Sequence, residues 1–141
     1  MDDHHAILNL LHDYVDAVDR KDWEKLGREI FTNEIDVDFV TWQAHTPAEA
    51  VHHIRSAIDR CGRTQHLLGS SRVEIDGDVA QAHTYVRAFH MGKGALAGDS
   101  YEMAGAYRDE LRRTEAGWRI ASRRGRLHFE QGNPAVLAPP A

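Results

Sequence analysis

The sequence predicts an α+β domain in which N-terminal helices pack against one face of a curved antiparallel sheet. Apolar residues in the first third of the chain recur at helical spacing, whereas the remainder contains four runs that are typical of strands. Turn signals between these runs, Asp76-Gly77-Asp78 above all, indicate hairpins and therefore antiparallel pairing. With 141 residues, the chain has the length of one domain.

Three helices are expected before Gly62. The first has an apolar stripe made of Ile7, Leu11, Tyr14 and Val18. Asp2 and Asp3 precede this stripe and provide an N-cap and negative charge at the positive end of the helix dipole. Asp22 caps a second, short helix, and Thr46 followed by Pro47 opens a third, which Gly62 ends. Residues 35–40 alternate between apolar and acidic side chains, which predicts a strand between the second and third helices.

The four longer strand-like runs follow at residues 67–75, 79–91, 101–111 and 118–129. The segment 92–98 is rich in glycine but lacks the order of a phosphate-binding loop, so we expect a flexible hairpin loop that rims a pocket. We therefore expect one domain over residues 1–133. The proline-rich tail at 134–141 cannot continue the sheet, and we expect it to be disordered or to lie on the surface or on a neighbour.

Composition and charge narrow the functional classes. A formal net charge of −5 argues against a nucleic-acid partner. The arginines that crowd the last third favour solvated strand faces and ion pairs, with an anion-binding surface as the alternative. No apolar run is long enough to span a membrane, the acidic N-terminus does not resemble a signal peptide, and Cys61 has no disulfide partner. We therefore expect a cytoplasmic location. Because the ten histidines show no tight ligand spacing, we expect no metal.

One pair of residues points to chemistry. His66 stands near the start of a predicted strand, and Asp19 stands near the end of the first predicted helix, 47 residues earlier. If the two side chains meet, the carboxylate fixes the imidazole tautomer and raises its basicity, which produces a general base near neutral pH. The alternative is an inert pair that satisfies a buried strand end. The spacing alone does not distinguish these interpretations.

The order of several motifs resembles the SnoaL-like members of the nuclear transport factor 2 (NTF2-like) superfamily, from Ile7 to Asn133. The motifs are, in order, Tyr-x-x-x-x-Asp-Arg-x-Asp-Trp, Phe-Thr-x-x-x-x-Val-Asp, Thr-Gln-His-Leu-Leu-Gly, Asp-Gly-Asp and Gly-x-Tyr-x-Asp-x-Leu-x-Arg-Thr-x-x-Gly-Trp-Arg-Ile. The resemblance implies a cone-shaped α+β barrel with a deep pocket. It also implies a homo-oligomer, either a dimer or a trimer.

Members of this superfamily include scytalone dehydratase, bile-acid 7α-dehydratase and hexachlorocyclohexane dehydrochlorinase, which are cofactor-free lyases. The resemblance implies that His66 is the base, that Asp19 orients it, and that Tyr14 assists at a carbonyl or leaving oxygen. It also implies a C-terminal strand arginine, for which Arg126 is the first assignment and Arg123 the competing one. The substrate-binding tyrosines of scytalone dehydratase have no clear counterparts here, so its substrate is not implied.

Trp42, Tyr85 and Met91 are the side chains that we expect to contact the substrate. Tyr14 raises a geometric question, because five residues on an ideal helix put it about 140° from Asp19. Both side chains face one pocket only if the helix ends or bends near Asp19.

Taken together, these features predict a cofactor-independent lyase that acts on a small or polycyclic apolar substrate. An isomerase or hydratase would use the same residues. The alternatives from other classes are a non-catalytic assembly module, such as the β subunit of a ring-hydroxylating dioxygenase, and a small-ligand carrier.

Overall fold

The computed structural model describes residues 1–137 and confirms the predicted α+β class. Its helices are α1 (Asp3–Arg20), α2 (Trp23–Arg28) and α3 (Pro47–Ile58), together with the 3-10 turns η1 (Gly94–Leu96) and η2 (Pro134–Val136). Its strands are β1 (Phe31–Phe39), β2 (Trp42–Ala44), β3 (Thr64–Asp76), β4 (Val79–Met91), β5 (Ser100–Thr114) and β6 (Gly117–Gly132). All predicted helices and strands are present; the short strand β2 was not predicted.

The strands form one sheet with the order β2-β1-β6-β5-β4-β3. The sheet is mixed, because β1 pairs with β6 in parallel while the other neighbours are antiparallel. The expected antiparallel pairing is therefore present at every neighbouring pair in the described sheet except β1 and β6. The β5–β6 hairpin, in which Gly117 adopts a φ of 111°, fixes the direction of β6, and β6 then runs alongside β1. Over residues 1–137 the sheet is open, with β2 and β3 at its edges.

Helix boundaries follow from local capping. The side chain of Asp2 accepts a hydrogen bond from the backbone N–H of His5 at 2.8 Å and so begins α1. At the other end, Lys21 takes up a left-handed conformation, with φ of 58°, and its N–H closes the last turn. Thr46 caps α3 in the same way as Asp2 caps α1, with Pro47 in the first turn.

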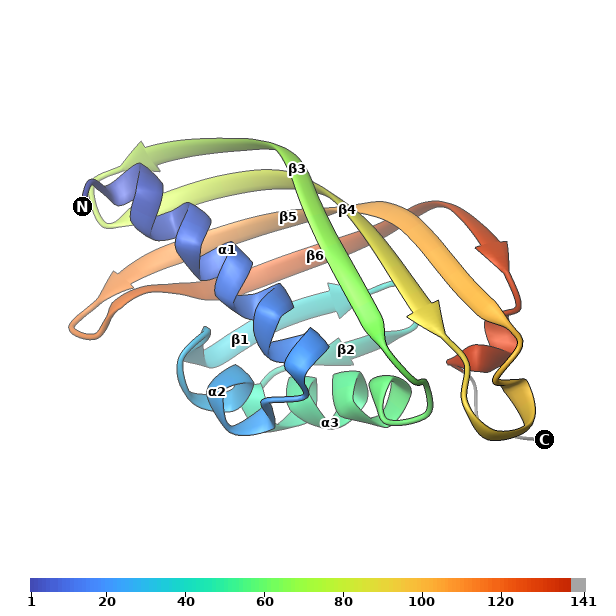
Figure 1. Cartoon of the computed structure of the whole chain (residues 1–141). Helices are drawn as coiled ribbons and strands as arrows, with labels where there is room; N and C mark the ends of the chain where they lie inside the picture. The colour runs from blue at the N-terminus through green and yellow to red at the C-terminus, as the bar shows by residue number, and fades with distance from the viewer. Residues whose placement is uncertain (138–141) are drawn as a thin grey trace.

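Helix α1 lies across one face of the sheet, and α2 and α3 lie beside β1 and β2 (Figure 1). We call the face covered by α1 the inner face. Most inner side chains of β4 are small, and the alanines at 80, 82 and 88 are almost fully buried beneath the helix layer. Small side chains there leave volume for α1 and for a cavity beside it. No helix of residues 1–137 is long and apolar enough to cross a membrane.

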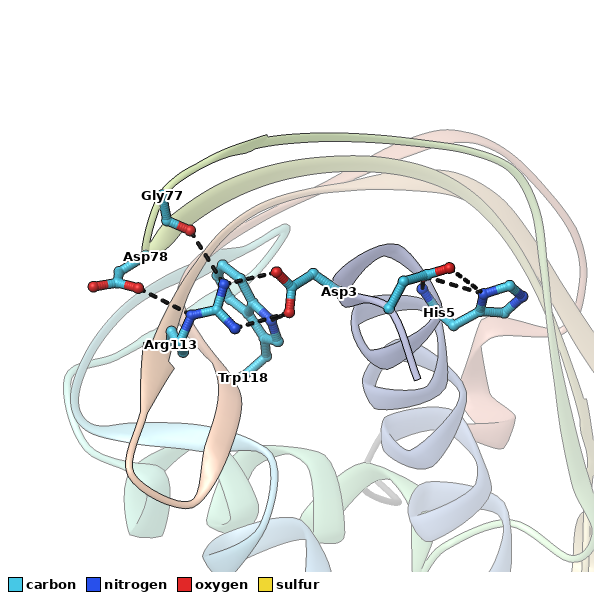
Figure 2. Close-up of polar contacts among 7 residues, drawn as sticks. Asp3, His5, Gly77, Asp78, Arg113 and Trp118 are labelled. Atoms are coloured by element: carbon cyan, nitrogen blue, oxygen red, sulfur yellow. Dashed lines mark hydrogen bonds and ion pairs between the residues drawn. The ribbon is translucent and has the colours of Figure 1, made fainter.

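The N-terminal end of α1 is fastened to two hairpins (Figure 2). The guanidinium of Arg113 donates two hydrogen bonds to the carboxylate of Asp3, at 2.8 and 2.7 Å, and one to Asp78 at 2.9 Å. The same guanidinium stacks on the ring of Trp118, whose indole N–H donates to Asp3 at 3.1 Å. These contacts hold the first turn of α1 against the β3–β4 and β5–β6 turns.

The C-terminal segment turns back onto the domain. Val136 in η2 is 1% exposed and packs into the core, while Leu137 reaches a pocket described below. The remainder of the predicted tail, residues 138–141, lies outside the described residues. The glycine-rich loop at 92–98 contains η1 and does not line that pocket.

Candidate active site

Asp19 and His66 are hydrogen-bonded. Oδ1 of Asp19 lies 2.7 Å from Nδ1 of His66, and Oδ2 accepts the backbone N–H of His66 at 2.9 Å. The hydroxyl of Thr64 also donates to Oδ1, at 2.8 Å. Because a carboxylate accepts at Nδ1, the neutral imidazole carries its proton on that nitrogen and keeps a free lone pair on Nε2.

The same contacts control the charge of the aspartate. Burial on its own would raise the pKa of Asp19, but the hydrogen bonds from His66 and Thr64 outweigh burial and lower this pKa. Asp19 therefore stays ionised at neutral pH. A fixed negative charge 2.7 Å from the ring stabilises the imidazolium that forms whenever Nε2 accepts a proton.

His66 opens into a cavity with two adjoining compartments. The inner compartment has a volume of about 90 Å³, and His66, His90 and Tyr14 contribute to its wall. The outer compartment has a volume of about 420 Å³ and leads from it towards the surface. The two share six lining residues, which are mostly aromatic or apolar: Phe39, Trp42, His53, Ala57, Met103 and Leu137. The wall that the two compartments share is therefore largely apolar, whereas the inner compartment adds His66 and His90.

Tyr14 and Asp19, which both lie in the C-terminal part of α1, contact different parts of the molecule. Tyr14 lines the inner compartment, whereas Asp19 lies behind His66 and bonds to β3. The angle of about 140° between them on the helix is therefore no obstacle, because only His66 has to reach the cavity. Burial raises the pKa of Tyr14 against the opposing effect of Arg123, so its hydroxyl stays protonated and can donate.

Of the two candidate arginines, Arg123 is the one on the inner face. Its guanidinium bonds to both carboxylate oxygens of Asp109, at 2.7 and 2.9 Å, and is 4.2 and 4.0 Å from the ring centres of Tyr14 and Tyr107. Among residues 1–137 nothing bonds to its Nη1. Arg126 is exposed on the outer face of β6 and lines neither compartment. The structure thus places the competing assignment, not the first one, beside Tyr14.

Of the three side chains that were expected to contact the substrate, one lines the cavity and two lie on the outer face. Trp42 lines both compartments, with its ring stacked between Phe39 at 5.3 Å and His53 at 4.9 Å. Tyr85 and Met91 point away from the cavity and are 51% and 47% exposed. Because side chains alternate along β4, they share the outer face and cannot reach a ligand in this cavity.

His90 is a site residue that the sequence analysis missed. It is buried on the inner face of β4, its ring lies 5.8 Å from that of His66, and its Nδ1–H donates to the carbonyl of Tyr101 at 2.9 Å. Burial, together with the nearby His66, lowers the pKa of His90 to about 4, so the ring is neutral at pH 7. The available signal was strand parity: His83 and His90 are an odd number of residues apart on β4, so their side chains point to opposite faces of the sheet.

Within residues 1–137, no three histidine, cysteine or acidic side chains gather closely enough to hold a metal ion. The side chains of Asp19, His66 and Tyr14 form the arrangement at the base of the cavity. It offers a positioned imidazole base, a carboxylate that stabilises its protonated form, and a protonated tyrosine on the same wall.

A family model and several solved structures have the same fold as this chain. The model of the SnoaL-like domain matches residues 1–124, and no curated protein matches the sequence. The structure of Kfla4162 from Kribbella flavida has 27% identity and a TM-score of 0.88, with 97% of each chain covered. A proposed aromatic ring hydroxylase from Novosphingobium aromaticivorans has 24% identity and a TM-score of 0.85, with 96% of each chain covered.

The hexachlorocyclohexane dehydrochlorinase LinA-type3 from Novosphingobium barchaimii is more distant, with 18% identity and a TM-score of 0.80 over 98% of this chain and 94% of that one. At this identity the likeness shows a shared fold. The family model covers most of the sequence, and the three structures share the arrangement of helices and sheet. The chain therefore belongs to the SnoaL-like family of the NTF2-like superfamily.

Proposed function

We propose that this protein is a cofactor-independent lyase that removes a proton from carbon with His66 as the general base. The observation that carries the proposal is the bond between Asp19 and His66 at the base of an aromatic-walled cavity. The dehydrochlorinase among the structural neighbours performs an elimination, which supports this reaction class. A positioned base contributes on the order of 10²–10⁴-fold to such a rate.

In the proposed elimination, Nε2 of His66 takes the proton from carbon next to an activating group. The electrons of the C–H bond form the new C=C bond, and the leaving group departs from the adjacent carbon with its electron pair. Asp19 stabilises the imidazolium, which then returns the proton to the departing hydroxide or to water. Tyr14 donates a hydrogen bond to the activating or departing oxygen.

The cavity supports an apolar substrate with a narrow reactive end. The inner compartment, about 90 Å³, accommodates only a small group against His66, whereas the outer one, about 420 Å³, accommodates a ring system. Isomerisation and hydration begin with the same proton transfer, so the dyad supports them equally. The three reactions differ in their products, so identification of the product distinguishes elimination from isomerisation and from hydration.

Hydrogen–deuterium exchange tests the common first step. The protein is incubated in D₂O with 2-tetralone and a panel of cyclic ketones, and loss of the acidic C–H signals is followed by proton NMR. His66→Asn keeps the bond to Asp19 but removes Nε2, so we expect exchange to slow about 10²-fold or more. His12→Asn, at an exposed position of α1, is the matched control and should exchange at the wild-type rate. Exchange that survives His66→Asn would refute the mechanism.

A second candidate is an assembly module, which the likeness to a proposed aromatic ring hydroxylase favours. A module of this kind needs no base, and its partner would be a larger iron protein. Absence of exchange across the ketone panel, together with co-purification of such a partner, would favour it over the lyase.

We also propose that the protein forms a dimer or trimer through the outer face of the sheet. Leu67 and Phe129 expose 59% and 54% of their surfaces there, and Phe89 exposes 43%. Clusters of exposed apolar side chains of this kind mark interaction surfaces. Size-exclusion chromatography with light scattering gives the mass directly, and a monomer at micromolar concentration would contradict the proposal.

A further inference from the structure

The register of the sheet places basic side chains opposite one another on its outer face. Arg72 of β3 lies opposite His83 of β4, and His83 lies opposite Arg108 of β5. Arg108 in turn lies opposite Arg124 of β6. Directly opposed side chains have their Cβ atoms roughly 5 Å apart, and like charges at that distance destabilise a sheet. Four strands therefore carry one continuous basic row.

Most other outer-face arginines are neutralised, but two members of this row are not. Arg124 bonds to Asp36 at 2.7 Å, Arg112 bonds to Glu110 at 2.8 Å, and Arg87 pairs with Glu102. In residues 1–137, by contrast, Arg72 and Arg108 have no acidic side chain within ion-pair distance. Within this part of the chain, no salt bridge therefore neutralises either guanidinium group, although acidic residues outnumber basic ones overall.

The two arginines border a groove of about 360 Å³. Its other lining residues are Glu74, Gln81, Ala82, His83 and Asp109. Alternation along the strands turns the side chain of Asp109 to the inner face, where it binds Arg123, so only its backbone faces the groove. Glu74 is then the single carboxylate among these lining side chains, against two guanidinium groups and an imidazole.

Further polar side chains of the same face continue the surface beyond the groove. The ring of Tyr85 lies 5.6 Å from that of His83 and 6.0 Å from that of His128. Arg126 belongs to the adjacent row, since both Tyr85 and Arg126 pair with Ala106. Tyr85 and Arg126, which the cavity does not use, therefore belong to this surface. The row that holds Tyr85 and Arg126 lies between the groove and the exposed apolar end of the sheet at Leu67 and Phe129.

We propose that this groove binds a phosphate group, either as the free ion or as a phosphate monoester. The forked guanidinium groups of Arg72 and Arg108 match phosphate oxygens, and Gln81 and His83 supply further N–H donors between them. A dianion between the two arginines removes the repulsion within the row. The groove lies on the face opposite the cavity, so this binding does not depend on the proposed catalytic role of His66.

Amide chemical shifts test the site. The protein is titrated at constant ionic strength with inorganic phosphate, with glycerol phosphate and with chloride. We expect saturable shifts at Arg72, His83 and Arg108 with both phosphates. Arg72→Gln/Arg108→Gln should weaken phosphate binding about tenfold or more, because charge-assisted bonds are lost. The control Arg20→Gln/Arg28→Gln removes two exposed arginines from the helical side and should bind normally.

Each arm has a decisive outcome. Shifts that chloride reproduces, or that survive in the Arg72→Gln/Arg108→Gln protein, would overturn the site. Equal weakening in the control protein would also overturn it, since net charge alone would then explain the binding. Tighter binding of glycerol phosphate than of inorganic phosphate would support the site and identify a monoester as the better ligand. Thermal unfolding of each variant verifies that it is folded.

Discussion

Replacing Arg123 by methionine should remove about 3–5 kcal/mol of stability, because it leaves the carboxylate of Asp109 buried without its partner. The two side chains are 2% and 0% exposed and are joined by bonds of 2.7 and 2.9 Å. Water cannot replace the guanidinium at this depth. Equilibrium unfolding in urea measures the loss, with the slope of the transition checked against wild type.

The double variant Arg123→Met/Asp109→Leu separates charge from packing. With neither charge buried, it should be within about 1–2 kcal/mol of wild type, since apolar replacement of a buried pair is often neutral or stabilising. Asp109→Leu alone should be as damaging as Arg123→Met, for it buries an unpaired guanidinium. A loss below about 1 kcal/mol for Arg123→Met, or a double variant as unstable as the sum of the single ones, would refute this reasoning.

Three further outcomes follow from the same cavity. His90 takes up its proton near pH 6.5 when unfolded but at about 4 when folded, so stability should fall by about 3 kcal/mol as the pH drops through this window. His90→Asn keeps a donor to Tyr101 and should flatten that dependence in urea titrations at several pH values; an unchanged slope would contradict the assignment. At Gly125 an added Cβ would overlap the ring of Phe39, which lines the cavity, so Gly125→Ala should displace that ring and weaken ligand binding, as calorimetry with a ketone would reveal. Ser122→Ala, on the same strand, should leave binding unchanged. Asp19→Asn should destabilise the protein by about 1–3 kcal/mol, because its amide cannot accept all three hydrogen bonds; a wild-type urea midpoint would contradict this.

The helices and the Asp19–His66 pair could be anticipated from the sequence because the signals are local. Caps such as Thr46 followed by Pro47 act within one turn, and the hairpin at Gly77 fixes the pairing of its own two strands. Once α1 and β3 were located, a resemblance of motifs was enough to suggest that Asp19 and His66 meet. The parallel pairing of β1 with β6 has no comparable local signal, because the strands are far apart in the chain.

Which face of β4 points inward was harder to predict. Large apolar side chains normally mark the buried face of a strand. Tyr85 and Met91, which were expected to contact the substrate, do not follow this rule. In this protein the inner face of β4 carries alanines, because α1 and the cavity occupy the space in front of it. The large side chains therefore point outward, and His90, on the inner parity, was overlooked. A cavity inverts the usual relation between side-chain size and burial along a strand.

The contacts at the two ends of α1 explain how this helix can hold the proposed catalytic geometry without contributing the proposed base. Its first turn is tied to the hairpins through Asp3 and Arg113, and its last turn is tied to β3 through Asp19. Two of the three bonds to Asp19 come from Thr64 and from a backbone N–H, neither of which depends on the imidazole. The carboxylate is thus placed by the fold before it acts on His66. Removing the imidazole should therefore abolish proton transfer while leaving α1 docked, whereas removing the carboxylate should disturb both.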